Sequence, residues 1–313
     1  MRSLTSKKVR SFKSMLFGNK ERSGLLSKLI IYSLLIFVGY VFIYPIIVMF
    51  TSSLKDSQDI VNPLVNWVPT HIYLENFTKA WITLGGTKTV LTTVGIAFAI
   101  ASLQTISAAV IGYGFAKFNF PFKRILFVLM IITFIIPEQV TFMPRYLIFK
   151  TYGMLESIMP FTIPAILGQG IKNTMFVLIF FQFFKMAPKA LDEAAEVDGA
   201  GFLKVFVKIN LPLAIPAVIV VFIFSFVWNW NETYLASLYY GTAITTMPLA
   251  LQRFTEMFLR MYPNIDASNP LMKLNEGIRM AGTILTIIPL MIAYLFIERK
   301  LIESIDSAGI TGE

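Results

Sequence analysis

Several polar and aromatic side chains lie inside stretches of sequence that are otherwise apolar. A charge at the centre of a bilayer costs about 2.5–3.5 kcal/mol on insertion scales, so such groups usually face a bundle interior or a water-filled cavity. Pro137 is expected to break a helix just before two of them. The candidates for a polar pathway are Glu138, Gln139, Lys172, Trp228, Asn229, Asn231 and Glu232.

Two interpretations of this set remain open. Sugars stack their apolar faces on aromatic rings and pair their hydroxyl groups with amides, and the mixture around Trp228 and Asn229 suits such a solute. Alternatively, Trp228 and Trp230 form an interfacial aromatic belt and the amides bond one helix to another. Lys172 is placed to neutralise either Glu138 or Glu232.

A second group lies between two apolar stretches, in the sequence MAPKALDEAAEVDGAGFLKVFVKINLP. Pro188 suits a first helical position, and Asp192 and Glu193 lie near the positive end of the helix dipole. Gly199 stands where this helix should stop, because glycine tolerates the left-handed conformation that ends helices. We therefore predict a short helix followed by a second one.

The second helix is predicted from the spacing of Phe202, Val205, Phe206 and Ile209. One interpretation is an amphipathic hairpin lying on a membrane surface. The other is a hairpin that docks on a protein, which is favoured by the small side chains of Ala194 and Ala195.

Other kinds of chemistry are excluded by composition. The chain has no cysteine, which removes disulfides and thiolate chemistry, and its single histidine, His71, lies in a predicted loop without a second metal ligand. No Gly-Lys-Ser/Thr phosphate-binding loop occurs, so we expect neither a metal nor ATP to bind this chain.

The elements that must position these residues are membrane spans. Of the 313 residues, 56% are hydrophobic and 14% charged, which is far from the balance of a soluble domain. A span needs about 20 mainly apolar residues. Six stretches qualify: 29–53, 89–116, 124–147, 158–184, 210–235 and 280–297.

Basic residues predict the orientation of these spans. Eight of them precede the first span, and the turn between the second and third carries Lys117, Lys123 and Arg124 without an acid. The positive-inside rule places both in the cytoplasm, and six spans return the C-terminus to that side. The basic tail lacks interleaved aromatic residues, so nucleic acid is not expected as a partner.

The predicted organisation is one all-α polytopic membrane protein with a basic tail at 1–28, a membrane domain at 29–297 and a cytoplasmic tail at 298–313. The segment 185–209 is a cytoplasmic loop, and the long segment 236–279 is external. The role of this external loop is left open.

The spacing of Glu193-Ala194-Ala195, Gly199, Ile209, Leu211 and Pro212 resembles the EAA loop of ATP-binding-cassette (ABC) importer permeases. The resemblance is to the carbohydrate-uptake class, in particular the smaller permease subunit of maltose and maltodextrin importers. It extends over most of residues 45–313, through AAVIGYGFAKFNFPFKRILF, IIPEQVTFMPRYLIFKTYGML and FVWNWNETYLASL.

The resemblance implies a type I ABC-importer fold in which the EAA loop docks in a groove of a separate ATPase. The residues implied in docking are Glu193, Ala194, Ala195, Asp198, Gly199, Ile209, Leu211 and Pro212. The tail DSAGITGE resembles a terminal segment that reaches the ATPase in relatives, which makes Gly309 and Gly312 further candidates in an extended conformation. A frayed polar terminus is the alternative.

The implied partners are a second permease, a dimer of ATPase subunits that carries ATP and Mg²⁺, an extracellular solute-binding protein, and membrane lipid. The implied location is the bacterial plasma membrane. A sugar or oligosaccharide is the expected cargo. The alternatives are another solute, such as a glycerophosphate or peptide, or a stand-alone channel or secondary transporter, which would not need an ordered loop at 188–212.

Overall fold

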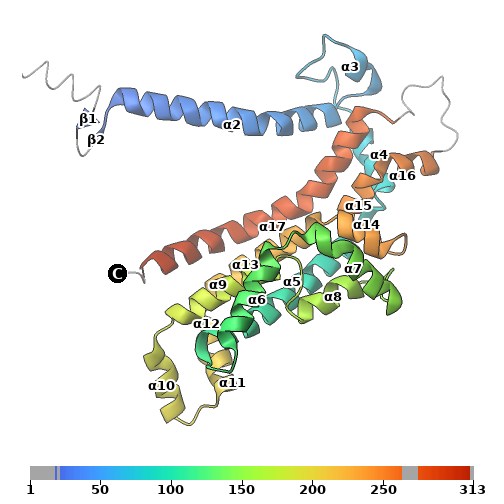
Figure 1. The fold of residues 1–313 in the computed structure, drawn as a ribbon. Coiled ribbons are helices and arrows are strands. Elements are labelled where there is room, and N and C mark those ends of the chain that lie inside the picture. Colours follow the sequence, from blue (N-terminus) through green and yellow to red (C-terminus); the bar gives the residue numbers. More distant parts are fainter. Residues whose placement is uncertain (1–17, 20–21, 263–273, 311–313) are drawn as a thin grey trace, which may run out of the picture. The chain divides into compact units, whose positions relative to one another are not determined.

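The protein is represented by a computed structural model that describes residues 18–19, 22–262 and 274–310. The regular elements of the described chain are helices, apart from one short antiparallel strand pair, β1 (Gly18–Asn19) with β2 (Arg22–Ser23). The all-α prediction is therefore confirmed. It forms two compact units. Unit 1 comprises residues 1–77 and 266–284, and unit 2 comprises 78–265 and 285–313. Figure 1 shows the helices with their labels.

Unit 1 contains α2 (Leu25–Ser53), α3 (Ser57–Val61) and the first residues of α4 (Glu75–Thr83) and α17 (Glu276–Ile310). Apolar side chains of α2 are exposed all round, as in Leu29 at 66% and Phe42 at 72%, which suits a helix surrounded by lipid.

The segment after α2, which contains the predicted loop of His71, is ordered by buried polar groups. Lys55 donates to the carbonyl oxygens of Val65 and Asn66 at 2.7 and 2.9 Å. Asp59 accepts from the backbone and the hydroxyl of Thr70, both at 2.8 Å. These bonds satisfy backbone groups that have no place in a helix ladder.

Unit 2 holds the remaining residues of α4 and α17 and all the helices between these two elements. Its elements are α5 (Gly86–Lys117), α6 (Lys123–Ile135), α7 (Glu138–Thr151), α8 (Met159–Ile166), α9 (Asn173–Met186), α10 (Lys189–Val197), α11 (Phe202–Val205), η1 (Phe206–Asn210), α12 (Leu211–Leu213), α13 (Ile215–Asn231), α14 (Tyr234–Tyr240), α15 (Met247–Gln252) and α16 (Phe254–Met261).

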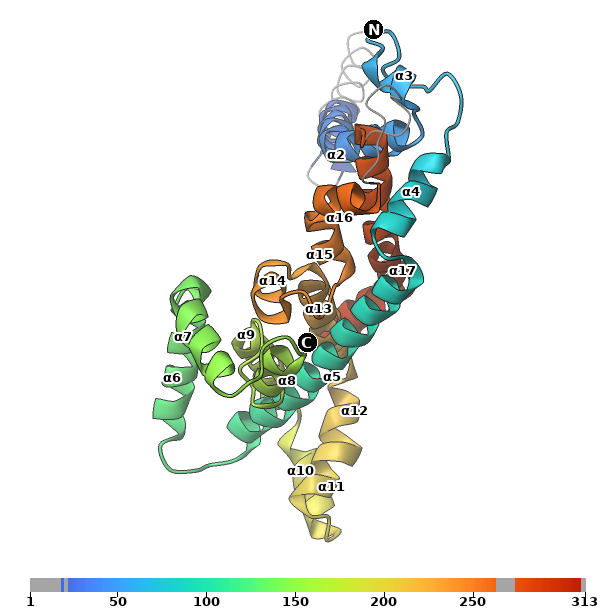
Figure 2. The same ribbon diagram turned by 90° about the vertical axis from the view of Figure 1, so that its right-hand side faces the viewer.

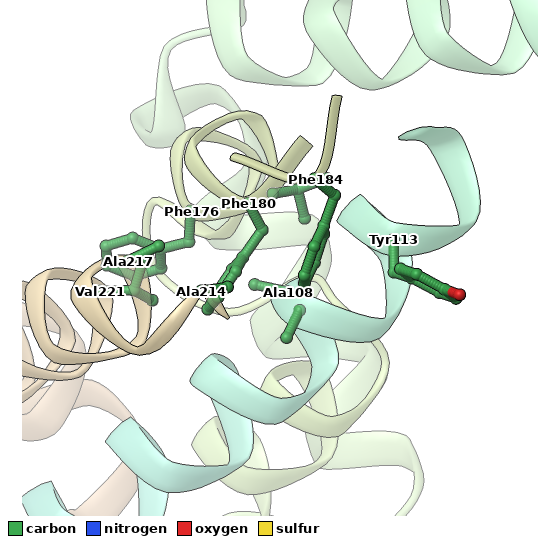
Figure 3. Packing of buried hydrophobic residues seen from close by; sticks show 10 residues of the cluster. Ala108, Tyr113, Phe176, Phe180, Phe184, Ala214, Ala217 and Val221 are labelled. Carbon is green, nitrogen blue, oxygen red and sulfur yellow. The ribbon is translucent and has the colours of Figure 1, made fainter. Parts of the chain in front are cut away.

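The core of unit 2 lies where α5, α9 and α13 meet. Figure 3 shows phenylalanines spaced along α9 beside small residues of the two other helices. Small residues let helix backbones approach closely. At Gly112 a Cβ atom would lie 2.7 Å from Phe180 Cβ and 2.9 Å from the nitrogen of Phe181, so glycine is required at this crossing.

Three described helices are long and apolar enough to cross a membrane: α2, α5 and residues 276–295 of α17. They match the first, second and sixth predicted spans. Three bent pairs meet the same criteria together, with angles of 100°, 71° and 77°. The count is six if each bent pair forms one span.

The third predicted span, 124–147, is not one helix. It divides into α6 and α7, which meet at 100° around Pro137. The ring of a proline disfavours helical geometry in the residue before it, and Ile136 is extended at ψ 125°. The prediction of a helix break at Pro137 within this span is therefore confirmed.

The fourth and fifth predicted spans, 158–184 and 210–235, are also interrupted. The fourth is divided into α8 and α9 by residues 167–172, where Gly168 and Lys172 have left-handed backbones with φ of 75° and 55°. In the fifth predicted span, helix α13 begins only at Ile215, because Pro216 has no N–H group to continue the preceding helix.

The last helix differs from the expected tail. α17 continues to Ile310, so Gly309 lies in a helix and the extended conformation predicted there is wrong. Gly312 lies outside the described residues.

The segment 236–279, which was predicted to be external, is helical in its first part. Met247, Leu249 and Phe258 have no exposed surface, and the backbone N–H of Met247 donates to Thr93 Oγ1 at 2.8 Å. Its residues 263–273 lie outside the described part of the chain.

Candidate functional site

The segment predicted as a docking loop forms a helical hairpin of α10 and residues 202–213. In both views it lies at the end of unit 2 away from α14 and α15 (Figures 1 and 2). Gly199 ends α10 in the left-handed conformation, with φ 74°. Its N–H bonds the carbonyl of Glu196 at 3.0 Å and the N–H of Ala200 bonds that of Ala195 at 2.9 Å, which is a Schellman cap. The predicted helix stop is confirmed, although α10 begins one residue after Pro188.

Asp192 fixes the hairpin to the rest of unit 2. Its Oδ2 lies 2.6 Å from Lys117 Nζ, at the end of α5, and its Oδ1 accepts from Asn210 Nδ2 at 2.7 Å. The side chains of Lys117 and Asp192 are 13% and 19% exposed, so solvent screens this pair only in part. One carboxylate thus joins α10 to α5 and to η1.

Aromatic rings make a second connection. The ring centroid of Phe206 in η1 lies 4.7 Å from that of Tyr113 in α5 and 6.1 Å from that of Phe184 in α9. Phe184 in turn stacks with Phe180 in the core. These ring contacts therefore connect the hairpin to the core of unit 2.

The residues proposed for docking do not share one environment. Glu193, Ala194, Asp198, Gly199 and Pro212 are exposed, whereas Ile209 and Leu211 are half-buried. Ala195 is 9% exposed, so little of its side chain is available to another protein, and its role as a docking contact stays a prediction. Its small size allows the second helix to pack closely.

Sequence reasoning missed two kinds of residue here. Lys117 and Asn210 were not recognised as partners of Asp192, since neither helical spacing nor the EAA pattern connects them. It also missed the exposed apolar side chains of the hairpin, among them Val197 at 87% and Phe202 at 67%. The predicted pattern groups Phe202 with Val205, which is 3% exposed, so periodicity does not distinguish the exposed side chain from the buried one.

A second site lies between the two helix breaks. It is a cavity of about 240 Å³ that is lined by residues 133–139 and 168–174, with Phe142, Arg145 and Leu235. Lys172 Nζ lies 2.9 Å from Glu138 Oε1 across it. Glu138, Gln139 and Lys172, three of the predicted pathway residues, are thus brought together.

The other pathway candidates are elsewhere. Asn229 Nδ2 donates to Gln104 Oε1 at 2.8 Å, so Asn229 bonds α13 to α5, as the alternative interpretation predicted. Trp228 packs on Phe176, and Asn231 donates to the carbonyl of Val227 in its own helix. Glu232 accepts from the N–H of Leu235 and caps the first turn of α14.

Gln104 was also missed by sequence reasoning. It has no exposed surface, and its Nε2 donates to the carbonyl of Ile171 at 2.9 Å in the break between α8 and α9. Its Oε1 accepts from Ser225 and Asn229. Non-helical backbone at membrane depth must be satisfied by protein, and Gln104 supplies this partner.

The described residues contain no group of three His, Asp or Glu side chains that could hold a metal ion.

Residues 108–306, more than half of the sequence, match the family described as binding-protein-dependent transport system inner membrane component. The chain belongs to this family. Members of this transport family are membrane subunits and not catalytic enzymes. The hairpin of α10 and residues 202–213 lies within the matched region, and so does Lys117.

The family includes named relatives of comparable length. The chain is 28% identical to the osmoprotective compounds uptake permease protein GgtD of Synechocystis, over 72% of this chain and 76% of the relative. It is 26% identical to the diacetylchitobiose uptake system permease protein NgcG of Streptomyces coelicolor, over 88% and 86%. The resemblance to carbohydrate-uptake permeases is thereby confirmed.

A solved structure has the same fold. It is a bacterial ABC transporter involved in the import of the acidic polysaccharide alginate, and one of its chains aligns with a TM-score of 0.68 over 87% of this chain and 95% of that one. The sequences are 17% identical, so this similarity concerns the fold.

Proposed function

We propose that this permease forms half of the translocation pathway of an ABC importer for a sugar or oligosaccharide, and that the hairpin of α10 and residues 202–213 couples it to a separate ATPase. Six spans cross the bacterial plasma membrane, with both termini and the hairpin in the cytoplasm. A second permease completes the pathway, a solute-binding protein delivers the cargo, and ATP and Mg²⁺ bind the ATPase dimer.

Two features of the hairpin support coupling to an ATPase: its base is fixed to α5, and its tip is exposed. The Lys117–Asp192–Asn210 contacts hold the hairpin to α5. The tip exposes apolar side chains such as Val197 and Phe202, which suit a groove on a partner protein. A hairpin without a fixed base could not transmit the closure of an ATPase to the spans.

The sugar cargo is supported by the named relative for diacetylchitobiose. The relative for osmoprotective compounds keeps another solute as the alternative. A stand-alone channel is disfavoured because it gives no reason for an anchored hairpin.

The test is to co-express the chain with the products of neighbouring genes, purify the complex and measure ATP hydrolysis in vesicles with and without the binding protein and candidate sugars. Glu193→Lys reverses an exposed charge at the tip, so it should leave the chain inserted while reducing stimulated hydrolysis and co-purification of the ATPase. Lys150→Glu, which reverses an exposed charge on α7 outside the hairpin, is the control. Unchanged stimulation and uptake in Glu193→Lys would contradict docking through this hairpin.

A further inference from the structure

The segment that follows α2 exposes apolar side chains although polar bonds hold it in place. Leu64 is 90% exposed, Val61 79% and Val68 76%. Between Asp59 and Glu75 the sequence has no Asp, Glu, Lys or Arg, and we call residues 60–74 the apolar segment. Exposed apolar side chains grouped in this way mark a contact with a protein or a membrane.

Trp67 shows at which level of α2 the apolar segment lies. Its ring centroid is 5.5 Å from that of Tyr44 in α2, with the two rings edge to face. The polar run that begins at Thr51 follows Tyr44 by seven residues, which is about 10 Å along the axis at 1.5 Å per residue. The chain therefore folds back along α2, and Trp67 lies beside a part of the helix that is still apolar.

The rings at this contact are of the kind found where a membrane meets water. Tyr40 adds a third ring, with its centroid 5.7 Å from that of Tyr44. All three side chains are exposed, and Trp67 is 48% exposed. Trp and Tyr are enriched at both membrane interfaces because each joins an apolar ring to one polar group. This cluster therefore favours lipid near the headgroups as its surroundings.

The backbone of the apolar segment is satisfied by the protein itself. Lys55 Nζ donates to the carbonyl oxygens of Val65 and Asn66 at 2.7 and 2.9 Å. The N–H groups of Leu64 and Val65 donate to the side-chain and carbonyl oxygens of Asn62 at 3.0 and 3.1 Å. Backbone groups that border hydrocarbon have no water to bind. These bonds let the neighbouring apolar side chains enter lipid without leaving the groups unpaired.

We propose that the apolar segment is a membrane anchor in the outer interface of the bilayer, with Trp67 beside α2 and with Leu64 and Val68 among the lipid acyl chains. The inference rests on α2 being a membrane span with the orientation proposed above, and it does not depend on the cargo or on the hairpin. A soluble binding protein does not reach this depth, and cover by the second permease is an outcome of the test below.

The anchor has a consequence for α2. The apolar side chains of this helix are exposed all round, so its own surface does not distinguish one rotation in lipid from another. Interfacial Trp and Tyr side chains set the tilt and rotation of such helices. The contact of Trp67 with Tyr44 gives α2 one preferred side and one preferred depth.

The sequence has no cysteine, so single thiols can be introduced as reporters. Leu64→Cys and Val68→Cys report on the apolar segment. Phe42→Cys, at an exposed position of α2, is the control for lipid contact, and Glu75→Cys, at an exposed charged position of the same unit, is the control for water.

Each variant of the complete importer is reconstituted in vesicles and labelled with a small thiol-reactive fluorophore. The importer without an introduced cysteine gives the background. One quencher is phosphatidylcholine with a spin label on its acyl chain, and the other is iodide in the external water.

In Leu64→Cys and Val68→Cys the spin-labelled lipid should quench the fluorophore about as strongly as in Phe42→Cys. Iodide should quench it several-fold less than in Glu75→Cys. Leu64→Asp, added to Val68→Cys, should remove most of the lipid quenching, because a carboxylate is costly in hydrocarbon. Leu64→Met, which keeps an apolar side chain of similar volume, should retain it.

Quenching by iodide as in Glu75→Cys, without quenching by lipid, would overturn the anchor. Protection from both quenchers would also overturn it, since another subunit would then cover the segment. ATP hydrolysis stimulated by the binding protein is measured in the same vesicles. Stimulated hydrolysis without lipid quenching contradicts the anchor alone, whereas lipid quenching without stimulated hydrolysis supports the anchor and contradicts the proposed coupling.

Discussion

Lys117 Nζ and Asp192 Oδ2 lie 2.6 Å apart, and this ion pair joins the last turn of α5 to the first turns of α10. Each charge lies at the helix end that favours it, the cation at a C-terminus and the anion near an N-terminus. Asn210 donates to the other oxygen of the same carboxylate. The pair therefore fixes the angle at which the hairpin leaves the bundle.

Removing one partner of the Lys117–Asp192 pair should weaken the coupling between the hairpin and the membrane spans. In Asp192→Asn the Lys117 charge loses its partner, and we expect the stimulation of ATP hydrolysis by the binding protein to fall about tenfold, which is about 1.4 kcal/mol of lost coupling. Lys117→Met should act in the same way. Stimulated and basal hydrolysis are measured in vesicles.

The control for these variants is Lys150→Met, which removes an exposed cation from α7. The exchanged pair Lys117→Asp with Asp192→Lys should recover part of the coupling, because the attraction is restored in reverse. Unchanged stimulation of ATP hydrolysis in Asp192→Asn would show that the ion pair plays no part in coupling the hairpin to the spans.

The C-terminal cap of α10 can be tested by comparing two glycines of the turn that follows this helix, Gly199 and Gly201. A Cβ atom at Gly199 or at Gly201 would meet nothing within 4 Å, but only Gly199 has a left-handed backbone. Gly199→Ala should therefore destabilise the end of α10 by about 1–2 kcal/mol, while Gly201→Ala should be nearly neutral. Hydrogen exchange of the amides of residues 196–200 measures the difference. Equal exchange in both variants would contradict the cap.

Local features of the site could be predicted from the sequence because they depend on neighbouring residues. Gly199 ends its helix for a conformational reason that acts within four residues. The break at Pro137 follows in the same way from the geometry of the residue before a proline.

Contacts between distant residues could not be predicted. Lys117 and Asp192 are 75 positions apart, and Gln104 and Asn229 are 125 apart. Asn229 was a pathway candidate because an amide in an apolar stretch fits both a solute and another helix, and only the packing of α5 against α13 distinguishes them. The break of the fourth span was signalled by Pro164, Gly168 and Gly170, but hydropathy alone conceals it.

The crossing of α5 and α9 gives a prediction on stability. At Gly112 a Cβ atom would lie within 3.0 Å of Val177 O and closer to Phe180, so Gly112→Ala forces the helices apart. We expect a loss of about 1–3 kcal/mol in the free energy of unfolding, which is typical of overpacking. Gly114→Ala, with open space at its Cβ, is the control in the same helix. Thermal unfolding of the purified chain in detergent measures both, and equal stability of the two variants would contradict the close crossing.

The ordered segment after α2 should depend on pH through Asp59. Burial raises the pKa of this carboxyl group, but the two hydrogen bonds from Thr70, together with the nearby His71 and Lys55, outweigh it and hold the pKa below its ordinary value. A lowered folded-state pKa means that the carboxylate stabilises this segment above the unfolded pKa of about 3.9 and ceases to do so as the pH falls through the folded value.

The amides of residues 57–70 should therefore be protected at neutral pH, and their protection relative to an unfolded chain at the same pH should fall below about pH 4, where the unfolded segment begins to bind the extra proton. Asp59→Asn should exchange faster at neutral pH and lose this acid transition, since asparagine does not titrate. Thr70→Val removes one donor and should move the transition to higher pH. Hydrogen exchange followed by mass spectrometry measures all three, and an unchanged acid transition in Asp59→Asn would assign it to another group.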